Sequence, residues 1–205
     1  AEVLQLLRMD DCNAHGVLAR RADALDGSEA DPTARGVRGA LLLASGSLVN
    51  HECLPTLARF DDCDAGSRSS ATACSTPCVS FRTLHAVPRG GELSLSYVPL
   101  LWDGEERRAR CRALFGFDCR CARCRAELRE EAEAQGKEAP AAGLGEEEAD
   151  WRYVDVFLLK YVCARPGCGG TLAPEAPGGS AAECNVCGAK RTEKEFLEEL
   201  QALQE

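Results

Sequence analysis

The chain has 205 residues, of which 45% are hydrophobic, so it is long enough to bury a core as one or two domains. Its formal net charge of −9 disfavours binding to nucleic-acid phosphates as a main activity and suits a basic partner such as a lysine-rich tail. Its apolar runs are shorter than the roughly 18 residues of a membrane-spanning helix, and residues 1–16 lack the pattern of a secretory signal.

The first third of the chain is predicted to alternate short ordered elements with loops. Residues 2–12 have the apolar spacing of a helix end, and residues 26–36 are rich in Asp, Gly, Ser and Pro, which predicts a loop. The apolar run at 40–44 predicts a buried strand. Residues 61–77 are small and polar, which predicts a hairpin loop.

The middle of the chain is predicted to contain two half-buried strands and a helix. Residues 79–84 and 93–98 each alternate apolar and polar side chains, as strands with one buried face do. The Pro-Arg-Gly-Gly sequence at 88–91 predicts a turn between them. Residues 104–114 are charged and amphipathic, which predicts a surface helix.

The last third begins with a predicted linker. Residues 127–150 are acidic, rich in Ala and Gly and without periodicity, which indicates a flexible connection. Residues 151–162 carry enough aromatic and β-branched side chains to be ordered. Thr192 and Glu195 have the spacing of a capping box, so we expect the last helix to begin there.

Cysteine is unusually frequent, with 13 residues, and its spacing favours zinc over disulfides. The number is odd, and seven of the 13 cysteines fall into C-x-C, C-x2-C and C-x4-C groups, whose thiolates can turn toward one metal ion. The first group consists of Cys119, Cys121 and Cys124. Tetrahedral zinc needs a fourth ligand, and Cys53 is the candidate.

A second cysteine group has the spacing of a zinc ribbon. Two pairs of cysteines are separated by a loop rich in Gly and Pro: Cys163 and Cys168, then Cys184 and Cys187. Four thiolates leave zinc without an open coordination position, so this site is predicted to be structural. The remaining cysteines are Cys12, Cys63, Cys74, Cys78 and Cys111. They are predicted to be loop or core residues, although the Cys74-x3-Cys78 pair is also able to bind a metal.

Three strings, at residues 47–55, 91–97 and 115–124, stand out together. In this order, and with the charged helix between the second and third, they resemble the carboxy-terminal half of a SET domain with its post-SET zinc site. The resemblance is to the SMYD-like branch, closest to its plant members, and residues 163–188 also look like that branch. It covers residues 10–125 and, more loosely, 151–190.

SET proteins transfer a methyl group from S-adenosylmethionine to a lysine amine, so the resemblance implies a protein-lysine N-methyltransferase acting on a histone or non-histone protein. It assigns Tyr97 as the catalytic tyrosine, Phe115 and Tyr97 as walls of the lysine channel, and Phe117 as the cover of the adenine. The cofactor-binding residues that it implies are Asn13, Ser47, Leu48, Asn50, His51, Tyr97 and Phe117. The post-SET zinc ligands that it implies are Cys53, Cys119, Cys121 and Cys124.

The implied fold is α+β, a mostly β SET-type fold followed by a small zinc-ribbon-like element and a terminal helix. Its predicted parts are the SET half with its zinc site at 1–125, the linker at 126–150, and the ribbon with the helix at 151–205. The family's Gly-x-Gly cofactor motif and MYND finger are not found upstream of Asn50. The chain is therefore expected to be a fragment or a degenerate member that binds S-adenosylmethionine weakly. Leu54 and Thr56 also depart from the family's usual Asp and Asn.

Two other kinds of protein compete with the enzyme. One is a non-catalytic, zinc-stabilised interaction module that kept the scaffold and lost the cofactor. The other is a double-zinc domain of the ubiquitin-ligase type, which the C-x-C-x2-C spacing and the lack of ligand histidines disfavour. The expected partner is a lysine-containing protein, without nucleic-acid or membrane binding, and the expected location is the nucleus, the cytoplasm or both.

Overall fold

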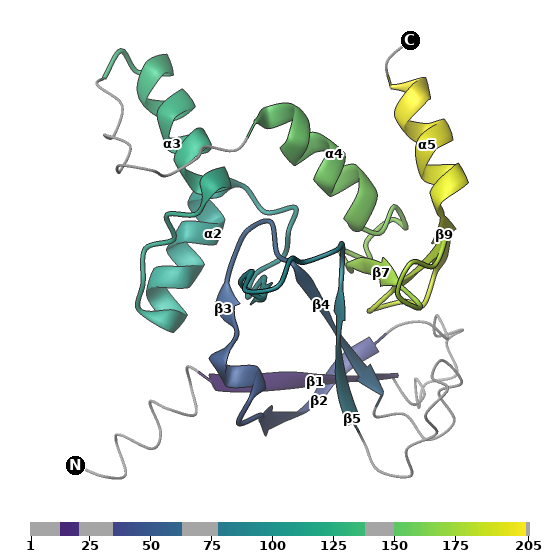
Figure 1. Ribbon diagram of the computed structural model, residues 1–205. Helices are drawn as coiled ribbons and strands as arrows, with labels where there is room; N and C mark the ends of the chain where they lie inside the picture. Colours follow the sequence, from purple (N-terminus) through teal and green to yellow (C-terminus); the bar gives the residue numbers. More distant parts are fainter. Residues whose placement is uncertain (1–12, 21–34, 63–77, 138–149, 204–205) are drawn as a thin grey trace, which may run out of the picture.

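The computed structural model describes residues 13–20, 35–62, 78–137 and 150–203 (Figure 1). Three two-stranded sheets form its first part: β1 (Ala14–Arg20) with β2 (Arg35–Leu42), β3 (Asn50–His51) with β6 (Ser94–Leu95), and β4 (Leu57–Asp62) with β5 (Cys78–Thr83). β3 and β6 run parallel, whereas the other pairs are antiparallel. A single turn of 3-10 helix, Gly46–Leu48, leads into β3.

The helices lie around these strands. α2 (Gly104–Arg110) continues into a π-helical segment (Cys111–Phe115), and α3 (Ala122–Ala134) packs beside it. The second part contains α4 (Trp151–Tyr161), a three-stranded antiparallel sheet and α5 (Glu193–Ala202). We call that sheet and its loops the ribbon; its strands are β7 (Leu172–Pro174), β8 (Ala181–Cys184) and β9 (Lys190–Thr192).

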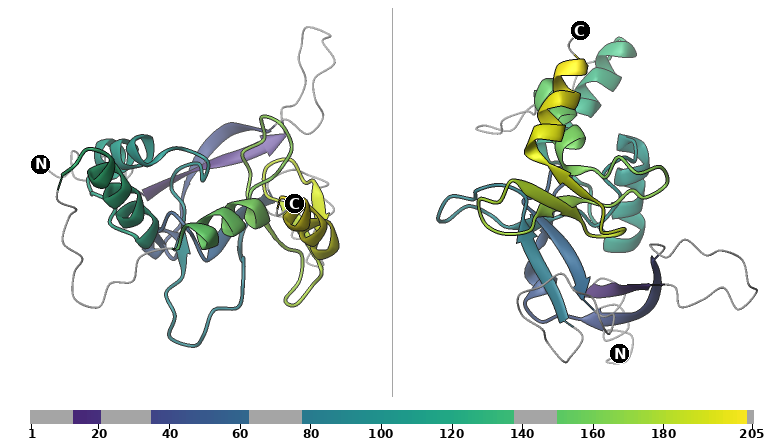
Figure 2. Two further views of the ribbon diagram at one scale, coloured as in Figure 1. Left: turned by 90° about the horizontal axis from the view of Figure 1, so that it is seen from above. Right: turned by 90° about the vertical axis from the view of Figure 1, so that its right-hand side faces the viewer.

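Figures 1 and 2 show α4 between the α2–α3 pair on one side and the ribbon with α5 on the other. Among the described residues, no helix combines the length and apolar character needed to cross a membrane. The mixture of helices and short strands agrees with the predicted α+β class. The SET arrangement itself stays a prediction at this point.

Several predicted elements are confirmed. Residues 79–84 lie in β5 and begin the loop after it, and Gly91 N–H donates to the Pro88 carbonyl at 2.9 Å in the predicted turn. Gly90 has φ +87°, a conformation that glycine adopts without strain. The helix predicted at 104–114 is formed by α2 and the π-helical segment. Thr192 and Glu195 make both hydrogen bonds of the predicted capping box at the start of α5.

The prediction that residues 40–44 form a buried strand is wrong in its burial. Residues through Leu42 are indeed part of β2, but the side chains of Leu41 and Leu42 are 37% and 62% exposed. The reason is that, among the described strands, β2 pairs only with β1, in a sheet of two strands. No other described element packs over the side chains of Leu41 and Leu42 at the end of β2. An apolar run by itself therefore did not show which face of the strand is covered.

The strand predicted at 93–98 is shorter than expected, since only residues 94–95 pair in β6. Backbone N–H groups that would pair with a neighbouring strand donate hydrogen bonds to side chains instead. Ser94 N–H donates to the Thr56 hydroxyl at 2.8 Å, and Tyr97 N–H donates to His51 Nδ1 at 3.1 Å. Thr56 N–H in turn donates to the Ser94 hydroxyl at 3.1 Å, so the departure from the family pattern at Thr56 leaves local hydrogen bonding intact.

The stretch predicted as a linker starts as a helix, because α3 extends to Ala134. Its acidic residues face arginines rather than solvent alone: Glu127 pairs with Arg123 at 3.1 Å and Glu131 pairs with Arg108 of α2 at 2.9 Å. Predictions for residues 2–12, 26–34, 63–77 and 138–149, including Cys12, Cys63 and Cys74, lie outside the described residues.

The main core joins the first sheets to α4 and the ribbon. It contains residues that are at most 8% exposed: Ala58, Phe60, Leu84, Leu100, Phe157, Tyr161, Val162 and Ala173. Phe157 of α4 is its centre on the helical side, with its ring 4.8 Å from that of Tyr161. The ribbon is therefore not an independent appendage but shares a core with β4.

We expect Phe157→Ala to lower the free energy of unfolding by about 3–5 kcal/mol, because Phe157 is 2% exposed and its loss opens a cavity in the main core. Urea denaturation followed by circular dichroism measures this loss. Tyr153→Ala is the matched control, since Tyr153 lies one turn earlier on α4 and is 51% exposed. Equal losses for the two variants would contradict the shared core.

Candidate functional site

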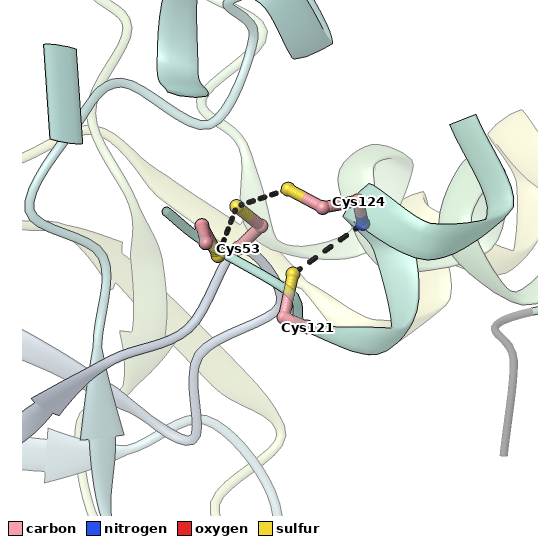
Figure 3. Close-up of side chains that lie close together, drawn as sticks. Cys53, Cys121 and Cys124 are labelled. Carbon is pink, nitrogen blue, oxygen red and sulfur yellow. Dashed lines mark hydrogen bonds between the residues drawn. The ribbon is translucent and has the colours of Figure 1, made fainter. Parts of the chain in front are cut away.

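The structure brings Cys53 together with Cys119, Cys121 and Cys124, and we call these four residues the first cysteine cluster. Their sulfur atoms all lie within 4.8 Å of one another, with Cys53 Sγ 3.6 Å from Cys124 Sγ. Figure 3 shows Cys53, Cys121 and Cys124 pointing toward a common centre. Four thiolates around a tetrahedral zinc lie about 3.8 Å apart, since each Zn–S bond is about 2.3 Å. The geometry therefore fits a zinc ion.

A buried arginine contacts this cluster. Arg107 is fully buried, and its Nε donates to Cys53 Sγ at 3.3 Å. Its Nη2 donates to Glu127 Oε2 at 2.5 Å, and its Nη1 donates to the Trp102 carbonyl. Burial alone would lower the pKa of Arg107, but the hydrogen bond to Glu127 and the contact with Cys53 raise it above its usual value. The guanidinium therefore stays charged beside the sulfurs.

The start of α3 supplies a further favourable dipole. Cys121 caps this helix, and Cys124 N–H donates to Cys121 Sγ at 3.4 Å. The positive end of a helix stabilises negative charge close to it. Hydrogen bonds within the cluster, first of all from Cys119, lower the pKa of Cys121 to about 6. Such a site is suited to hold thiolates, which are the form of cysteine that binds metal.

His51 links the first cysteine cluster to Tyr97. Its Nδ1 accepts the Tyr97 backbone N–H at 3.1 Å, and its Nε2 lies 3.4 Å from Cys53 Sγ. Burial, as the main cause, lowers the pKa of His51, so the ring is neutral. Because Nδ1 accepts, the ring proton is on Nε2 and points at the sulfur. The imidazole thus ties the position of Tyr97 to that of the cluster.

Four rings gather next to the cluster. The Tyr97 ring centre lies 4.9 Å from that of Phe115, 5.3 Å from that of His51 and 6.5 Å from that of Phe117. The Tyr97 hydroxyl donates to the Val49 carbonyl at 2.5 Å. Burial, followed by the nearby Cys111, raises the pKa of Tyr97 above its usual value. The phenol is therefore neutral at physiological pH, and its oxygen can still accept a hydrogen bond.

Two cavities meet at this aromatic group. One, of about 450 Å³, lies against the first cysteine cluster and is lined by Asn50, His51 and Phe117; we call it the cluster-side cavity. The other, of about 340 Å³, reaches the ribbon, and we call it the ribbon-side cavity. Tyr97 and Phe115 line both of them. The two cavities therefore share these two side chains in their walls.

The residues predicted to bind a cofactor are distributed over the two cavities. Asn50, His51 and Phe117 lie on the cluster side, and Asn50 Nδ2 donates to Glu92 Oε1 at 3.0 Å. Asn13 and Ser47 line the ribbon-side cavity, where the Ser47 hydroxyl lies 3.4 Å from the Asn13 carbonyl. Leu48 lines neither cavity and is 80% exposed.

The second cysteine cluster consists of Cys163, Cys168, Cys184 and Cys187, whose sulfur atoms also lie within 4.8 Å of one another. The closest pairs are Cys168–Cys184 at 3.6 Å and Cys163–Cys187 at 3.7 Å. Gly170 is required here, because a Cβ atom on it would lie 2.4 Å from Cys184 Sγ. This cluster fits tetrahedral zinc as well as the first does.

Sequence reasoning missed the charged residues behind the first cysteine cluster. Arg107 and Arg123, which are 0% and 5% exposed, both pair with Glu127. Arginines on an amphipathic helix ordinarily face solvent, so they carried no signal of burial. The one available signal was the position of Glu127 four residues after Arg123, which is the spacing of a helical ion pair.

Comparison with known proteins places these features in context. No protein-family model matches the chain. It is 30% identical to the histone-lysine N-methyltransferase ASHR2 of Arabidopsis thaliana over 92% of its own length, and it covers 51% of that protein. Over 60% of its length it is 29% identical to the histone-lysine N-methyltransferase SMYD3 of Mus musculus, and over 45% it is 29% identical to Smyd1 of the same species. It spans about half of ASHR2 and covers 23% and 19% of the two mouse proteins.

Proposed function

Since the chain is a relative of the SMYD-like SET proteins, we propose that it forms the methyl-transfer site of a protein-lysine N-methyltransferase that uses S-adenosylmethionine. One observation carries this proposal: Tyr97 and Phe115 line two cavities at once. Methyl transfer between a cofactor and a protein needs such an arrangement, because donor and acceptor enter from different sides and meet at a narrow aromatic passage.

The cluster-side cavity is the proposed place of the cofactor. Its volume of about 450 Å³ lies within the usual range for cofactor sites. Phe117 offers an aromatic face for the adenine, and the exposed Asn50 offers an amide for the polar amino-acid end. Bound S-adenosylmethionine would supply a sulfonium methyl group for an in-line displacement.

The ribbon-side cavity is the proposed place of the substrate lysine. An amine that approaches the Tyr97 and Phe115 rings from this cavity loses water, which lowers its pKa and favours the neutral, nucleophilic form. The Tyr97 hydroxyl donates to Val49 and can accept a hydrogen bond from the amine, which orients the nitrogen. The aromatic faces also tolerate the cationic methylated product.

The two cysteine clusters are the proposed zinc sites, and both are structural because four thiolates leave no open position. The first one joins β3, which carries Asn50 and His51, to the start of α3 and to the segment that carries Phe117. Zinc there would hold the walls of the cluster-side cavity together. The zinc ion would take no part in methyl transfer.

We expect Arg107→Met to lower the zinc affinity of the first cysteine cluster by about 10- to 100-fold, as loss of a hydrogen-bonding neighbour of a metal ligand typically does. Competition with a chromophoric chelator measures this affinity. Arg112→Met is the matched control, because Arg112 lies one turn along and is 59% exposed in its pair with Asp118. Equal zinc affinities for the two variants would remove Arg107 from this role.

The proposed function is tested by incubating the protein with radiolabelled S-adenosylmethionine and a panel of lysine-containing proteins, histones included. Transfer of label to lysine is the expected result, and calorimetric titration measures the binding of the cofactor, which we expect to be weak, independently. Two bound zinc ions without cofactor binding or transfer would instead support a non-catalytic interaction module. The substrate protein and a nuclear or cytoplasmic location stay predictions.

A further inference from the structure

The ribbon supplies one wall of the ribbon-side cavity. The two loops that flank its cysteines line this cavity together with Tyr97 and Phe115. The residues concerned are Gly169, Gly170, Thr171, Asn185 and Val186. The second cysteine cluster therefore stands next to the space in which the proposed substrate lysine would lie, although it is remote in sequence from the aromatic passage.

This wall is firmly attached to β4 and β5. Asn185 Nδ2 donates to the Arg59 carbonyl at 2.9 Å, and Asn185 Oδ1 accepts the Thr171 N–H at 2.8 Å. Arg82 and Glu183 form an ion pair of 2.8 Å in which both side chains are largely buried, at 16% and 11% exposed. Figure 1 shows β7 reaching the end of β4, in agreement with the core that they share. The two parts thus present one continuous surface to a ligand.

The second cysteine cluster sets the shape of the wall. Val186 N–H donates to Cys184 Sγ at 3.4 Å, so the position of this residue follows that of the sulfur. Gly170 approaches Cys184 and Val186 too closely to carry a side chain. Both loops are therefore held at a fixed distance from the passage for as long as the four sulfurs stay together.

The chemistry of the cavity indicates what it accepts. Among the described residues that line it, Arg59 and Asp61 are charged and neutralise each other in an ion pair of 2.9 Å. His15 also lines it, and burial lowers the pKa of its imidazole, which is therefore neutral. Arg59 also donates to the Gly16 carbonyl at 2.5 Å. Leu57 and Val186 add aliphatic surface. A charged group entering here would lose water without gaining a free counter-charge, whereas a small aliphatic group would lose nothing.

We propose that the ribbon is a substrate-recognition element in which Val186 and its neighbours contact the residue beside the target lysine and select a small, uncharged side chain there. This inference rests on the proposed function, since it gives the ribbon-side cavity to the protein substrate. It assigns to the second cysteine cluster the task of holding a specificity wall, beyond stabilising the fold.

The test is methyl transfer to lysine peptides in which the residue before or after the lysine is Val, Ala, Leu or Glu. For the unaltered protein we expect kcat/KM to be at least about 10-fold higher with Val or Ala than with Glu, as expected when a charge enters an uncharged site. Val186→Lys places a cation in the wall, so it should raise the Glu-to-Val ratio of kcat/KM by about 10-fold or more.

Leu197→Lys is the matched control, because it makes the same chemical change on the exposed face of α5, away from the cavity. Cofactor affinity and the zinc content measured by native mass spectrometry should be equal in all three proteins. If Val186→Lys loses zinc, Val186→Ala serves instead and should shift the preference from Ala toward Leu.

Transfer with identical peptide preferences in the Val186 variants and the control would overturn the recognition role and leave the proposed function standing. Absence of transfer to every peptide and protein, together with absence of cofactor binding, would overturn both. The two failures are thus distinguishable.

Discussion

Tyr97→Phe is expected to lower kcat for methyl transfer by about 100- to 1,000-fold, the usual effect of removing one hydrogen-bonding group that is aimed at a reacting centre. The hydroxyl is held by the Val49 carbonyl in the passage between the two cavities, so its loss leaves the amine without an orienting acceptor. Cofactor affinity should change little, because the ring contacts with Phe115 and His51 persist. Steady-state kinetics and calorimetric titration measure the two effects separately.

Tyr153→Phe controls for loss of a phenolic hydroxyl elsewhere, since Tyr153 lies on α4 and lines neither cavity. A Tyr97→Phe protein that transfers methyl groups at the original rate would show that the hydroxyl has only a structural bond to Val49. A parallel loss of cofactor affinity would place Tyr97 in binding rather than in orientation of the amine.

Cys53→Ser has the largest expected effect on stability. Structural zinc sites contribute apparent free energies of about 10–16 kcal/mol, which is as large as the whole stability of a typical domain, about 5–15 kcal/mol. The region around β3, β6 and α3 is therefore not expected to stay folded without the first zinc ion. Native mass spectrometry should show one zinc ion per chain instead of two, and cofactor binding should be lost.

Two other cysteines provide the controls. Cys111 is as buried as Cys53 and packs in the same core, but its sulfur is not part of the first cysteine cluster. Cys111→Ser should therefore keep two zinc ions. Cys163→Ser removes the second zinc ion and should reduce transfer to peptides while the cofactor still binds. A Cys53→Ser protein with both zinc ions and full activity would contradict the coupling of metal and site.

Local spacing predicted the cysteine groups, because cysteines two to five positions apart in a turn or a loop lie close together in space whatever the rest of the fold. The fourth member of the first cluster was harder to identify, since Cys53 lies 66 positions before Cys119 and only long-range packing brings the two together. The resemblance to a known family therefore completed what spacing left open. The structure brings together all eight cysteines of the two predicted sites.

The division of the candidate site was not predictable from sequence. Asn13, Ser47 and Asn50 were assigned to one cofactor site, yet the first two line the ribbon-side cavity and the third lines the cluster-side cavity. The sequence also did not predict that the ribbon lines the ribbon-side cavity, because this placement depends on the hydrogen bond from Asn185 to β4. Such contacts depend on the packing of whole elements, which periodicity and composition do not encode.

The two cysteine clusters differ in how far apart their members lie along the chain. Cys53 and Cys124 are separated by 71 positions, whereas Cys163 and Cys187 are separated by 24. Closing the longer loop costs about 1 kcal/mol more chain entropy, and sites built from local contacts form faster. We therefore expect an unfolded chain that refolds to fill the proposed zinc site of the ribbon first.

Synthesis reverses this order. Cys124 is translated roughly 3–13 s before Cys187 at about 5–20 residues per second. A growing chain can thus complete its long-range site while the ribbon does not yet exist. Zinc available during translation would then let the site around Tyr97 assemble before that of the ribbon, the reverse of the order expected on refolding.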